Sequence, residues 1–293
     1  MHTIGLVLHP QRDSAEAVGA VLGWAAGNGT QVLGIGDEIM RLNCAATAVS
    51  ASELGRRSDL LVSLGGDGTM LRAMRLADGQ RAPVLGVNLG KLGFLAEVDV
   101  PELPRALSAI DANDYTIEPR LAIDATMGSA VFTAFNDVAA VRVPGQGIAV
   151  VAVHVGGQPF VSYAADAVIA ATPAGSTAYS FSAGGPIISP SVEALLITPA
   201  SPHSAYNRGV VLSVTDTVTL ELLPSCGRLA IEVDGLVSCY ADAGQGIALR
   251  ARPAGARVVR LGQSTFYQRA RRKLRITDSA EIPAPLPGSS FDY

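Results

Sequence analysis

Cysteine and histidine are scarce in this sequence, and their spacing excludes several kinds of site. The cysteines form an odd set in which no two lie two residues apart: Cys44, Cys226 and Cys239. This spacing supports neither a disulfide framework nor a zinc ribbon. The four histidines are scattered and show no metal-ligand spacing. We therefore expect no metal ion held by protein side chains alone.

Long apolar runs and a surplus of positive charge are also missing. No apolar stretch reaches the roughly 18 residues that a membrane-spanning helix needs, and the N-terminus lacks a signal-peptide layout. The formal net charge of −4 argues against a general nucleic-acid binder, which needs a basic surface to displace counterions. These absences predict a protein of the reducing cytoplasm that binds neither membrane nor nucleic acid.

The sequence does contain enough apolar residues for a sizeable core. Of its 293 residues, 48% are hydrophobic and 16% are charged, which is unlike the composition of a disordered chain. This length favours one large domain or two medium ones. Aromatic residues make up only 5%, while Ala, Val, Leu and Gly dominate, which suits closely packed α/β layers.

The first third of the chain alternates between strand-like and helix-like segments. After the first apolar run, Asp13 and Glu16 form a capping-box pattern, and apolar residues then recur at helical spacing. Alternation of this kind predicts a parallel sheet with ligands at the carboxyl ends of its strands. The expected strands are Thr3–Leu8, Gln31–Ile35, Asp59–Leu64 and Pro83–Asn88.

From Tyr115 to about Gly262 the pattern changes to short strands separated by turn signals such as Asp234-Gly235. A helix is expected only around Ser191–Ile197, so this part predicts an all-β domain of sandwich type. The expected strands include Leu121–Thr126, Val131–Phe135, Ile148–Val155, Val210–Val214, Thr217–Leu222, Leu229–Val233 and Ile247–Ala251.

These patterns divide the chain into three parts. Residues 1–117 are expected to form an α/β domain with a Rossmann-like parallel sheet, and residues 118–263 a β-sandwich domain. Within the third part, residues 264–293, the stretch 264–275 predicts one more helix. The tail beyond Thr277 holds three prolines and is expected to be disordered.

The first candidate site is the run Gly65-Gly66-Asp67-Gly68-Thr69, which follows an expected strand and opens a helix. Its glycines let backbone N–H groups approach phosphates, and a helix N-terminus favours anions. Asp67 can help to hold Mg²⁺ or accept the proton of an attacking hydroxyl. Thr69 can cap the helix, on which Arg72 is a further candidate for nucleotide binding. A tight strand–helix turn with a capping Asp is the alternative interpretation.

The phosphate site predicted here is of an uncommon kind, because the sequence contains neither a Walker A pattern nor G-x-G-x-x-G. G-x-S-x-G is also missing, which disfavours a serine hydrolase. A second candidate segment, Asn88-Leu89-Gly90-Lys91-Leu92-Gly93-Phe94-Leu95, follows the fourth strand and is expected at the same sheet edge. Its Phe94 is either a ring that stacks on a base or an ordinary core residue.

Two further segments place polar residues among apolar ones. Asn136-Asp137 interrupts the expected strand Phe132–Val141, and buried polar groups need partners, which a sugar, a base edge or neighbouring backbone can supply. The segment Thr172–Pro186 is small, uncharged and rich in hydroxyls, and offers many donors to a nucleoside. Asp166 precedes it in an apolar surround and needs a partner as well.

A run of basic residues lies near the C-terminus and comprises Arg269, Arg271, Arg272, Lys273 and Arg275. Charge runs of this kind usually form a solvated helix face, which is the interpretation that we favour. A contribution to holding phosphates is the alternative.

In this order the four segments resemble the NAD kinase family. That family carries a GGDGT loop, N-x-G-x-x-G-F-L, an Asn-Glu pair, and T-P-x-G-S-T-A-Y followed by Gly-Gly-Pro. The resemblance is strong over residues 60–190 and continues faintly through Val233-Asp234-Gly235 to the basic helix. It implies an α/β N-terminal domain, a C-terminal β-sandwich, a last helix that returns to the first domain, and homodimers or homotetramers.

The resemblance also implies the reaction, which is phosphorylation of the 2′-hydroxyl of NAD's adenosine ribose by ATP or polyphosphate. Mg²⁺ or another divalent metal would be held mainly by the nucleotide phosphates. Asp67 matches the catalytic aspartate, Asn136, Asp137 and Tyr179 would hold the adenosine, and Asp166 would meet the nicotinamide side. The candidate nucleotide-binding residues are Gly65, Gly66, Gly68, Thr69, Arg72, Asn88, Phe94, Leu95, Asn136, Asp137, Asp166, Ser176, Thr177, Ala178 and Tyr179.

Some positions depart from the family's pattern. Asp137 is one methylene shorter than the usual Glu, Ala165 and Ala167 flank Asp166 where Gly is commoner, and Ala174 replaces a Thr or Ser. These departures leave open a paralogue that binds NAD(P) without phosphorylating it. A lipid or sphingoid-base kinase is the other alternative, because diacylglycerol kinases share the GGDGT loop. The T-P-A-G-S-T-A-Y run and the absence of an obvious membrane-facing helix argue against it.

Overall fold

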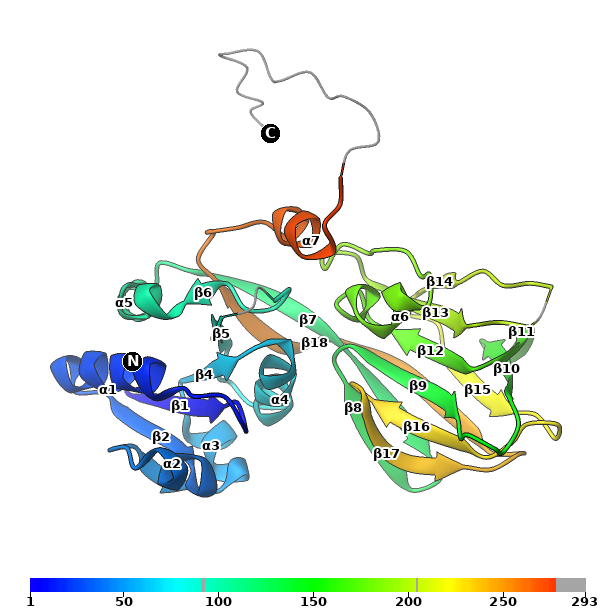
Figure 1. The fold of residues 1–293 in the computed structure, drawn as a ribbon, viewed down its shortest axis with the longest axis horizontal. Coiled ribbons are helices and arrows are strands. Elements are labelled where there is room, and N and C mark those ends of the chain that lie inside the picture. The colour runs from blue at the N-terminus through cyan, green and yellow to red at the C-terminus, as the bar shows by residue number, and fades with distance from the viewer. Residues whose placement is uncertain (91–92, 204, 278–293) are drawn as a thin grey trace, which may run out of the picture.

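The protein consists of two lobes joined by two long strands (Figure 1). The computed structural model describes residues 1–90, 93–203 and 205–277, so the tail predicted to be disordered lies outside the described residues. The joining strands are β7 (Thr116–Met127) and β18 (Gly246–Arg260), which pair antiparallel with each other along most of their length.

The N-terminal lobe alternates strands and helices, as predicted. Its central strands run in the order β3-β2-β1-β4-β5, all parallel, with β6 beside β5. The four predicted strands are confirmed to within one residue at each end. In chain order the elements are β1 (Thr3–Leu8), α1 (Ala15–Asn28), β2 (Gln31–Ile35), α2 (Gly36–Leu42), β3 (Thr47–Val49), α3 (Ala51–Arg57), β4 (Leu60–Gly65), α4 (Asp67–Ala77), β5 (Val84–Asn88), β6 (Val98–Asp99), the 3₁₀ helix η1 (Val100–Glu102) and α5 (Leu103–Asp111).

Helices cover both faces of this parallel sheet. On one face α1 and α5 bury apolar side chains such as Val21 and Leu107, and on the other α3 and α4 bury Leu54, Met70 and Met74. Strands that are buried on both sides read as nearly continuous apolar runs, which is why β1 and β4 were recognisable in the sequence. The carboxyl ends of β4 and β5 therefore emerge together, and the candidate loops follow them.

The first helix starts differently from the prediction. Its N-cap is Ser14, whose side chain makes no capping bond, and the Asp13 carboxylate accepts the Ala15 N–H instead. The predicted capping box between Asp13 and Glu16 is therefore wrong. Capping boxes form at two other helix starts, one of which pairs Ser50 with Glu53 at α3. The sequence pattern alone does not identify the N-cap, which lies at Ser14, one residue after the predicted Asp13.

The C-terminal lobe is a sandwich of two antiparallel layers, as predicted. One layer is the sheet β14-β13-β12-β9-β16-β17, and the facing layer contains β11-β10-β15-β18, with β7 beside β18 and β8 beside β7. Both layers contribute to one apolar core. The elements other than β7 and β18 are β8 (Ala130–Ala134), β9 (Asp137–Arg142), β10 (Ala149–Val155), β11 (Gln158–Ala165), β12 (Ala167–Ala171), η2 (Gly175–Thr177), α6 (Tyr179–Ser182), β13 (Ala194–Ala200), β14 (Val210–Ser213), β15 (Val218–Leu222), β16 (Leu229–Val233) and β17 (Leu236–Ala241).

Two sequence predictions in this lobe need correction. The helix expected around Ser191–Ile197 is wrong, because the chain there enters the fully buried strand β13, which pairs with β12 and β14. A short apolar run gives no periodicity that separates a buried strand from a helix. The strand expected over Phe132–Val141 is interrupted, since β8 ends at Ala134 and β9 begins at Asp137.

The larger sheet continues from one lobe into the other. Strand β18 pairs antiparallel with β15 at Leu249 and parallel with β5 at Val258, so its two ends belong to different lobes. The predicted boundary between residues 117 and 118 falls inside β7, and the domain limits therefore stay a prediction. Arg252 of β18 adds a polar connection, because its guanidinium donates to Asp78 after α4 and to Asp124 of β7.

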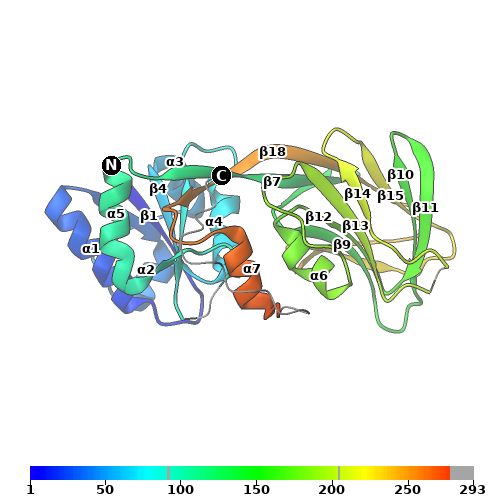
Figure 2. The same cartoon turned by 90° about the horizontal axis from the view of Figure 1, so that it is seen from above.

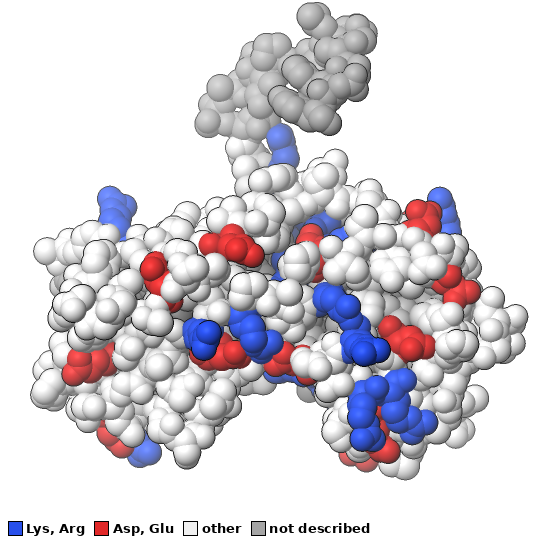
Figure 3. Space-filling model, turned by 180° about the vertical axis from the view of Figure 1, so that it is seen from behind, with Lys and Arg blue, Asp and Glu red and all other residues white. Residues whose placement is uncertain are grey.

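The predicted C-terminal helix is α7 (Phe266–Leu274), and it returns to the N-terminal lobe. Figures 1 and 2 show it above the junction between the lobes. A capping box between Thr265 and Gln268 fixes its start. From behind, a notch separates the lobes along one edge, and side chains of both charges are interspersed on this face (Figure 3). Among the described residues, no helix is long and apolar enough to span a bilayer.

Candidate active site

The loop after β4 places Asp67 at the first position of α4. Gly66 is the N-cap in an extended conformation, and the Met70 N–H donates to its carbonyl at 3.0 Å. A side chain at position 65 would meet the Thr69 hydroxyl at 2.2 Å, so the motif needs glycine there. The predicted capping role of Thr69 is wrong, because Thr69 lies within the first helical turn and its buried hydroxyl finds no partner in the part of the chain that the structure describes.

The Asp67 carboxylate is held by the second predicted segment. Its oxygens accept the backbone N–H groups of Phe94 at 3.2 Å and Leu95 at 3.0 Å. A Cβ at Gly93 would lie 2.3 Å from the carboxylate, so this close approach requires glycine. The two loops therefore meet at one sheet edge as predicted, and they fix the direction of the carboxylate.

A residue from the end of the chain completes this arrangement. The Lys273 ammonium of α7 lies 2.5 Å from Asp67 Oδ2 and 4.4 Å from the centre of the Phe94 ring. Charge–ring distances of this size are stabilising. The interpretation of the basic run as a solvated face is therefore wrong for Arg269, which is 2% exposed. Lys273 lies at an exposed position, as that interpretation expects, but its ammonium contacts Asp67. In the sequence analysis, a contribution of this run to holding phosphates was only the alternative interpretation.

One pocket of about 400 Å³ borders this loop and is lined by both lobes. Arg12, Arg72 and Arg75 bring positive charge to it, next to the N-terminus of α4, and such a combination favours phosphates. Arg72 is held by an ion pair with Glu38 and a bond to the Leu8 carbonyl. The lining residues are Leu8, His9, Pro10, Arg12, Gly66, Asp67, Gly68, Thr69, Arg72, Arg75 and Leu236.

Asn88 is not brought into that pocket. Its side-chain oxygen is buried without a partner among the described residues, and it lines a separate pocket of about 470 Å³ with Ser14 and Asp99. The next residue, Leu89, donates its N–H to the Gly65 carbonyl at 3.2 Å. Asn88 thus lies beside the glycine loop but lines a different pocket from Asp67.

The Asn136-Asp137 segment is organised by Asp234, a residue that the sequence indicated as part of a turn and of the fainter resemblance but not as a site residue. Asp234 Oδ1 accepts the N–H groups of Phe135, Asn136 and Asp137 at 3.0, 2.7 and 3.3 Å. Its other oxygen lies 2.7 Å from the guanidinium of Arg75 on α4. This ion pair ties the helix that carries Asp67 to the break between β8 and β9.

Acidic groups gather around this break. Burial, and then the neighbouring Asp234 and Glu232, raise the pKa of Asp137 to about 7. Burial raises the pKa of Tyr179 as well, with smaller contributions from Glu232, Asp166 and Asp137. Asp166 finds its partner in Arg142, at 2.5 Å. Asp137 and Asp166 are thus close enough to Tyr179 to affect its pKa, and the binding roles of these three residues stay a prediction.

The hydroxyl-rich segment is partly structural. Thr172 and Ser176 are fully buried, and Ser176 donates to the Pro173 carbonyl and accepts the Ile188 N–H. Ser176 thus holds the segment together, and the expected direct contact with a ligand has no support in this geometry. A Cβ at Gly175 would meet the Asn136 carbonyl at 2.0 Å, which fixes this turn against the Asn136 segment. Thr177, Ala178 and Tyr179 are part-exposed and stay available.

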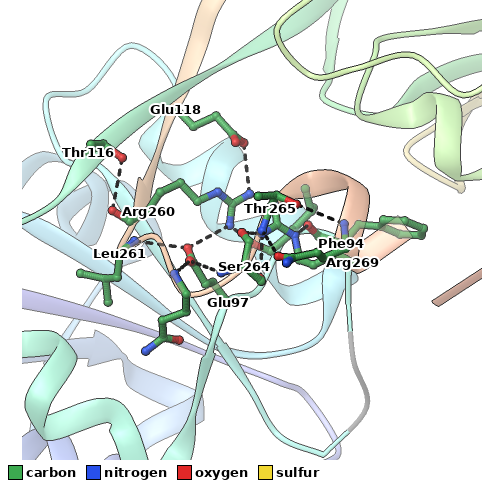
Figure 4. Close-up of polar contacts among 12 residues, drawn as sticks. Phe94, Glu97, Thr116, Glu118, Arg260, Leu261, Ser264, Thr265 and Arg269 are labelled. Atoms are coloured by element: carbon green, nitrogen blue, oxygen red, sulfur yellow. Dashed lines mark hydrogen bonds and ion pairs between the residues drawn. The ribbon is translucent and has the colours of Figure 1, made fainter. Parts of the chain in front are cut away.

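Two arginines bind the backbone carbonyls of the Phe94–Leu95 segment (Figure 4). Arg260 donates to the Leu95 carbonyl at 2.8 Å and to Glu118 at 3.1 Å. Arg269 donates to the Phe94 carbonyl at 3.2 Å and to the Ser264 carbonyl at 2.6 Å. Glu97 accepts the N–H groups of Leu261 and Gln263 at the start of the final segment. These contacts attach the last segment of the chain to the loop that holds Asp67.

Fold and site together define a two-domain nucleotide-binding protein of the kinase class, with phosphates expected at a glycine loop between an α/β lobe and a β-sandwich. Residues 4–115 match the model of the ATP-NAD kinase N-terminal domain, and residues 135–261 match the C-terminal domain of the same family. The chain belongs to the ATP-NAD kinase family, which confirms the resemblance seen in the sequence.

Individual relatives agree with this assignment. An NAD kinase of Desulforamulus reducens is 37% identical over 94% of this chain and 98% of its own length. NAD kinase 1 of Streptomyces avermitilis is 36% identical over 94% of this chain and 88% of its own length. The fold is similar to that of yeast NADH kinase complexed with NADH, with a TM-score of 0.83, 24% identity, and coverage of 97% of this chain and 90% of that one. The fold is also similar to that of an Archaeoglobus fulgidus NAD kinase in complex with ATP. The TM-score is 0.73 and the identity 22%, with coverage of 93% of this chain and 98% of that one.

Proposed function

We propose that the protein is an NAD kinase, which transfers a phosphoryl group from a nucleotide to the 2′-hydroxyl of NAD's adenosine ribose. The observation that carries the proposal is the position of Asp67, whose carboxylate is fixed at the N-terminus of α4 beside a pocket with three arginines. Family membership and the fold of relatives that were crystallised with NADH and with ATP support it.

In this proposal Asp67 accepts the proton of the ribose 2′-hydroxyl. The bond between this oxygen and the donor's terminal phosphorus forms while the bond from that phosphorus to its bridging oxygen breaks, and the nucleoside diphosphate leaves with the bonding electrons. The α4 amides with Arg12, Arg72 and Arg75 neutralise the donor's phosphates. Positioning and charge neutralisation of this kind supply most of the catalysis in phosphoryl transfer.

The acceptor is proposed to lie along the break between β8 and β9. Asn136, Asp137 and Tyr179 would hold the adenosine, with Thr177 and Ala178 beside them, and Asp166 would meet the nicotinamide side. The electrostatic neighbourhood of Asp137, Asp166 and Tyr179 supports this placement. The Arg75–Asp234 ion pair holds it in register with Asp67.

The donor is proposed to be ATP or polyphosphate with Mg²⁺ or another divalent metal. The described residues contain no group of three or more His, Cys, Asp or Glu that could hold a metal ion. Any such ion would therefore be held mainly by the donor's own phosphates, where it would neutralise their charge. The roles of Asp67 and the arginines do not depend on it.

We also propose that the protein is a cytoplasmic homodimer or homotetramer. Large apolar side chains are exposed on strands at the ends of both sandwich layers, such as Phe160 on β11 and Val211 on β14. Exposed apolar groups on edge strands favour association with another chain. Analytical ultracentrifugation is expected to give a mass of two or four chains, and a monomer at micromolar concentration contradicts this proposal.

One assay separates the proposed function from its alternatives. Purified protein is incubated with Mg²⁺, ATP and either NAD or a diacylglycerol, and NADP and phospholipid are measured. We expect NADP to form in the incubation with NAD and no phosphorylated lipid to form in the incubation with diacylglycerol. Phosphorylation of the lipid instead would indicate a lipid kinase. Binding of NAD without any NADP would indicate a non-catalytic NAD-binding paralogue, and either result rejects the proposal.

A further inference from the structure

The last helix brings one cation to Asp67 from 206 residues away in the sequence. The Lys273 ammonium touches the carboxylate oxygen that also accepts the Phe94 N–H, and it covers the Phe94 ring. Lys273 is not among the residues that line the donor pocket with Arg12, Arg72 and Arg75. Lys273 thus contacts Asp67 together with the Phe94 segment, whereas the three arginines line the donor pocket.

The position of Lys273 is fixed by the contacts of its helix. The capping box of Thr265 and Gln268 sets where α7 begins. One turn before Lys273, the buried Arg269 binds the Phe94 carbonyl, so the helix is attached to the loop that holds Asp67 (Figure 4). Residues four apart lie on the same helix face, and Arg269 and Lys273 consequently face the same loop. This anchoring places the exposed Lys273 side chain against Asp67 and the Phe94 ring.

The proposed reaction creates a charge problem at this point. When the 2′-hydroxyl loses its proton to Asp67 and gains the phosphoryl group, a new phosphate carrying close to two negative charges stands next to the former base. Once Asp67 releases that proton, carboxylate and phosphate repel each other unless a cation lies between them. Lys273 is the cation that already contacts the carboxylate, and an ammonium can serve both anions at once because it has three donors.

We propose that Lys273 has two roles. Before transfer it positions the Asp67 carboxylate, and after transfer it binds the new 2′-phosphate of the product. The inference rests on the proposed function. It assigns a ligand class to Lys273, namely the 2′-phosphate of the product dinucleotide, and it predicts that this lysine discriminates NADP from NAD. If Lys273 only stabilised the fold, its replacement would change the affinities for NAD and NADP by the same factor.

Calorimetric titration of the full chain with NAD or NADP, without a phosphoryl donor, tests this prediction. Lys273→Met is expected to weaken NADP binding by about tenfold to a hundredfold, which is the size of one lost charged hydrogen bond. NAD binding is expected to change less than about threefold, because the lost contact involves the 2′-phosphate. Lys273→Arg keeps a cation and is expected to restore most of the NADP affinity. Arg272→Met, one residue away on an exposed position, is the matched control.

Turnover gives a second readout. With ATP and NAD, Lys273→Met is expected to lower kcat by about 10²-fold, as removal of one preorganised donor does, while KM for NAD stays nearly constant. Equal weakening of NAD and NADP binding, or unchanged binding of both, overturns the inference. Lys273→Gln repeats the test if the Met variant does not fold. If the unaltered protein forms no NADP, the proposed function has failed; if it forms NADP and Lys273→Met keeps the NADP preference, only the role of Lys273 has failed.

Discussion

Ionisation of Asp137 is expected to make the stability of this protein depend on pH. The side chain is 3% exposed, and burial together with Asp234 and Glu232 raises its pKa from 3.8 to about 7. Between these two values the folded chain binds more protons at this position than the unfolded chain. The free energy of unfolding that this group contributes is therefore fully present below about pH 4 and is lost as the pH rises through about 7.

The variant Asp137→Asn isolates this effect, because an amide stays neutral at every pH. The rise from 3.8 to about 7 corresponds to at most about 4 kcal/mol at the usual conversion per pKa unit. We expect the free energy of unfolding of Asp137→Asn, relative to that of the unaltered protein, to rise by about 2–4 kcal/mol between pH 4.5 and pH 8. Other titrating groups are common to both proteins and cancel in the difference.

Urea unfolding of both proteins, followed by circular dichroism at several pH values between 4.5 and 8, measures this difference. Asp242→Asn is the control, because its side chain is 71% exposed and its ion pair with Arg228 is long at 3.7 Å. That variant is expected to show no pH-dependent change in the free energy of unfolding. A difference for Asp137→Asn that is constant with pH, or that falls between pH 4.5 and pH 8, would refute the reasoning.

Two further substitutions test the geometry around Asp67 and Asp137. Gly93→Ala places a Cβ 2.3 Å from the Asp67 carboxylate and is expected to lower kcat at least tenfold, because a displacement of about 1 Å can cost two orders of magnitude. Steady-state kinetics measures it against Gly23→Ala, whose new Cβ meets nothing within 4 Å, and equal kcat values contradict the expectation. Asp234→Ala removes the acceptor of three backbone N–H groups and is expected to cost about 3 kcal/mol in urea unfolding and to raise KM for NAD more than KM for ATP. Asp216→Ala, which removes one exposed turn acceptor, is its control, and an equal loss in both variants argues against the role of Asp234.

Most strands of the fold could be predicted from short patterns of apolar and turn residues in the sequence. The buried runs that became β1 and β4 are almost continuously apolar and are followed by glycine or turn residues, so their type and limits were predictable. Strand β15 was predicted as a short run bounded by turn signals, and in the structure its buried and part-exposed residues alternate. The apolar run that became β13 had no such alternation, because both of its faces are buried, and it was misassigned to a helix.

The loops of the site were predictable where their motifs are contiguous. The glycine loop of Asp67 and the Phe94–Leu95 segment meet because β4 and β5 are neighbours in a parallel sheet. Lys273 and the Arg75–Asp234 ion pair depend on chain segments that are far apart, and no spacing within the sequence encodes such contacts. Ser176 shows that a residue within a functional motif can have a structural role. Its hydroxyl was predicted to contact a ligand, but the structure buries it.

The Arg75–Asp234 pair also explains how the two lobes are held in register. Arg75 lies two turns after Asp67 on the same helix, and its partner Asp234 fixes the backbone of Asn136 and Asp137. A second connection joins Asp78, directly after α4, to Arg252 of β18. Helix α4 is thus attached to the sandwich at both points, and the distance between the proposed base and the proposed acceptor site does not depend on a flexible linker.

The central claim is that Asp67 accepts the proton of the dinucleotide's ribose hydroxyl, and Asp67→Asn tests it most directly. Asparagine keeps the oxygen that accepts the Leu95 N–H but cannot take up a proton as a carboxylate does. We expect kcat for NADP formation to fall by about 10²- to 10⁴-fold, while the dissociation constant for NAD, measured by calorimetry, stays nearly unchanged. A variant that retains full kcat would contradict the claim and remove Asp67 from the reaction.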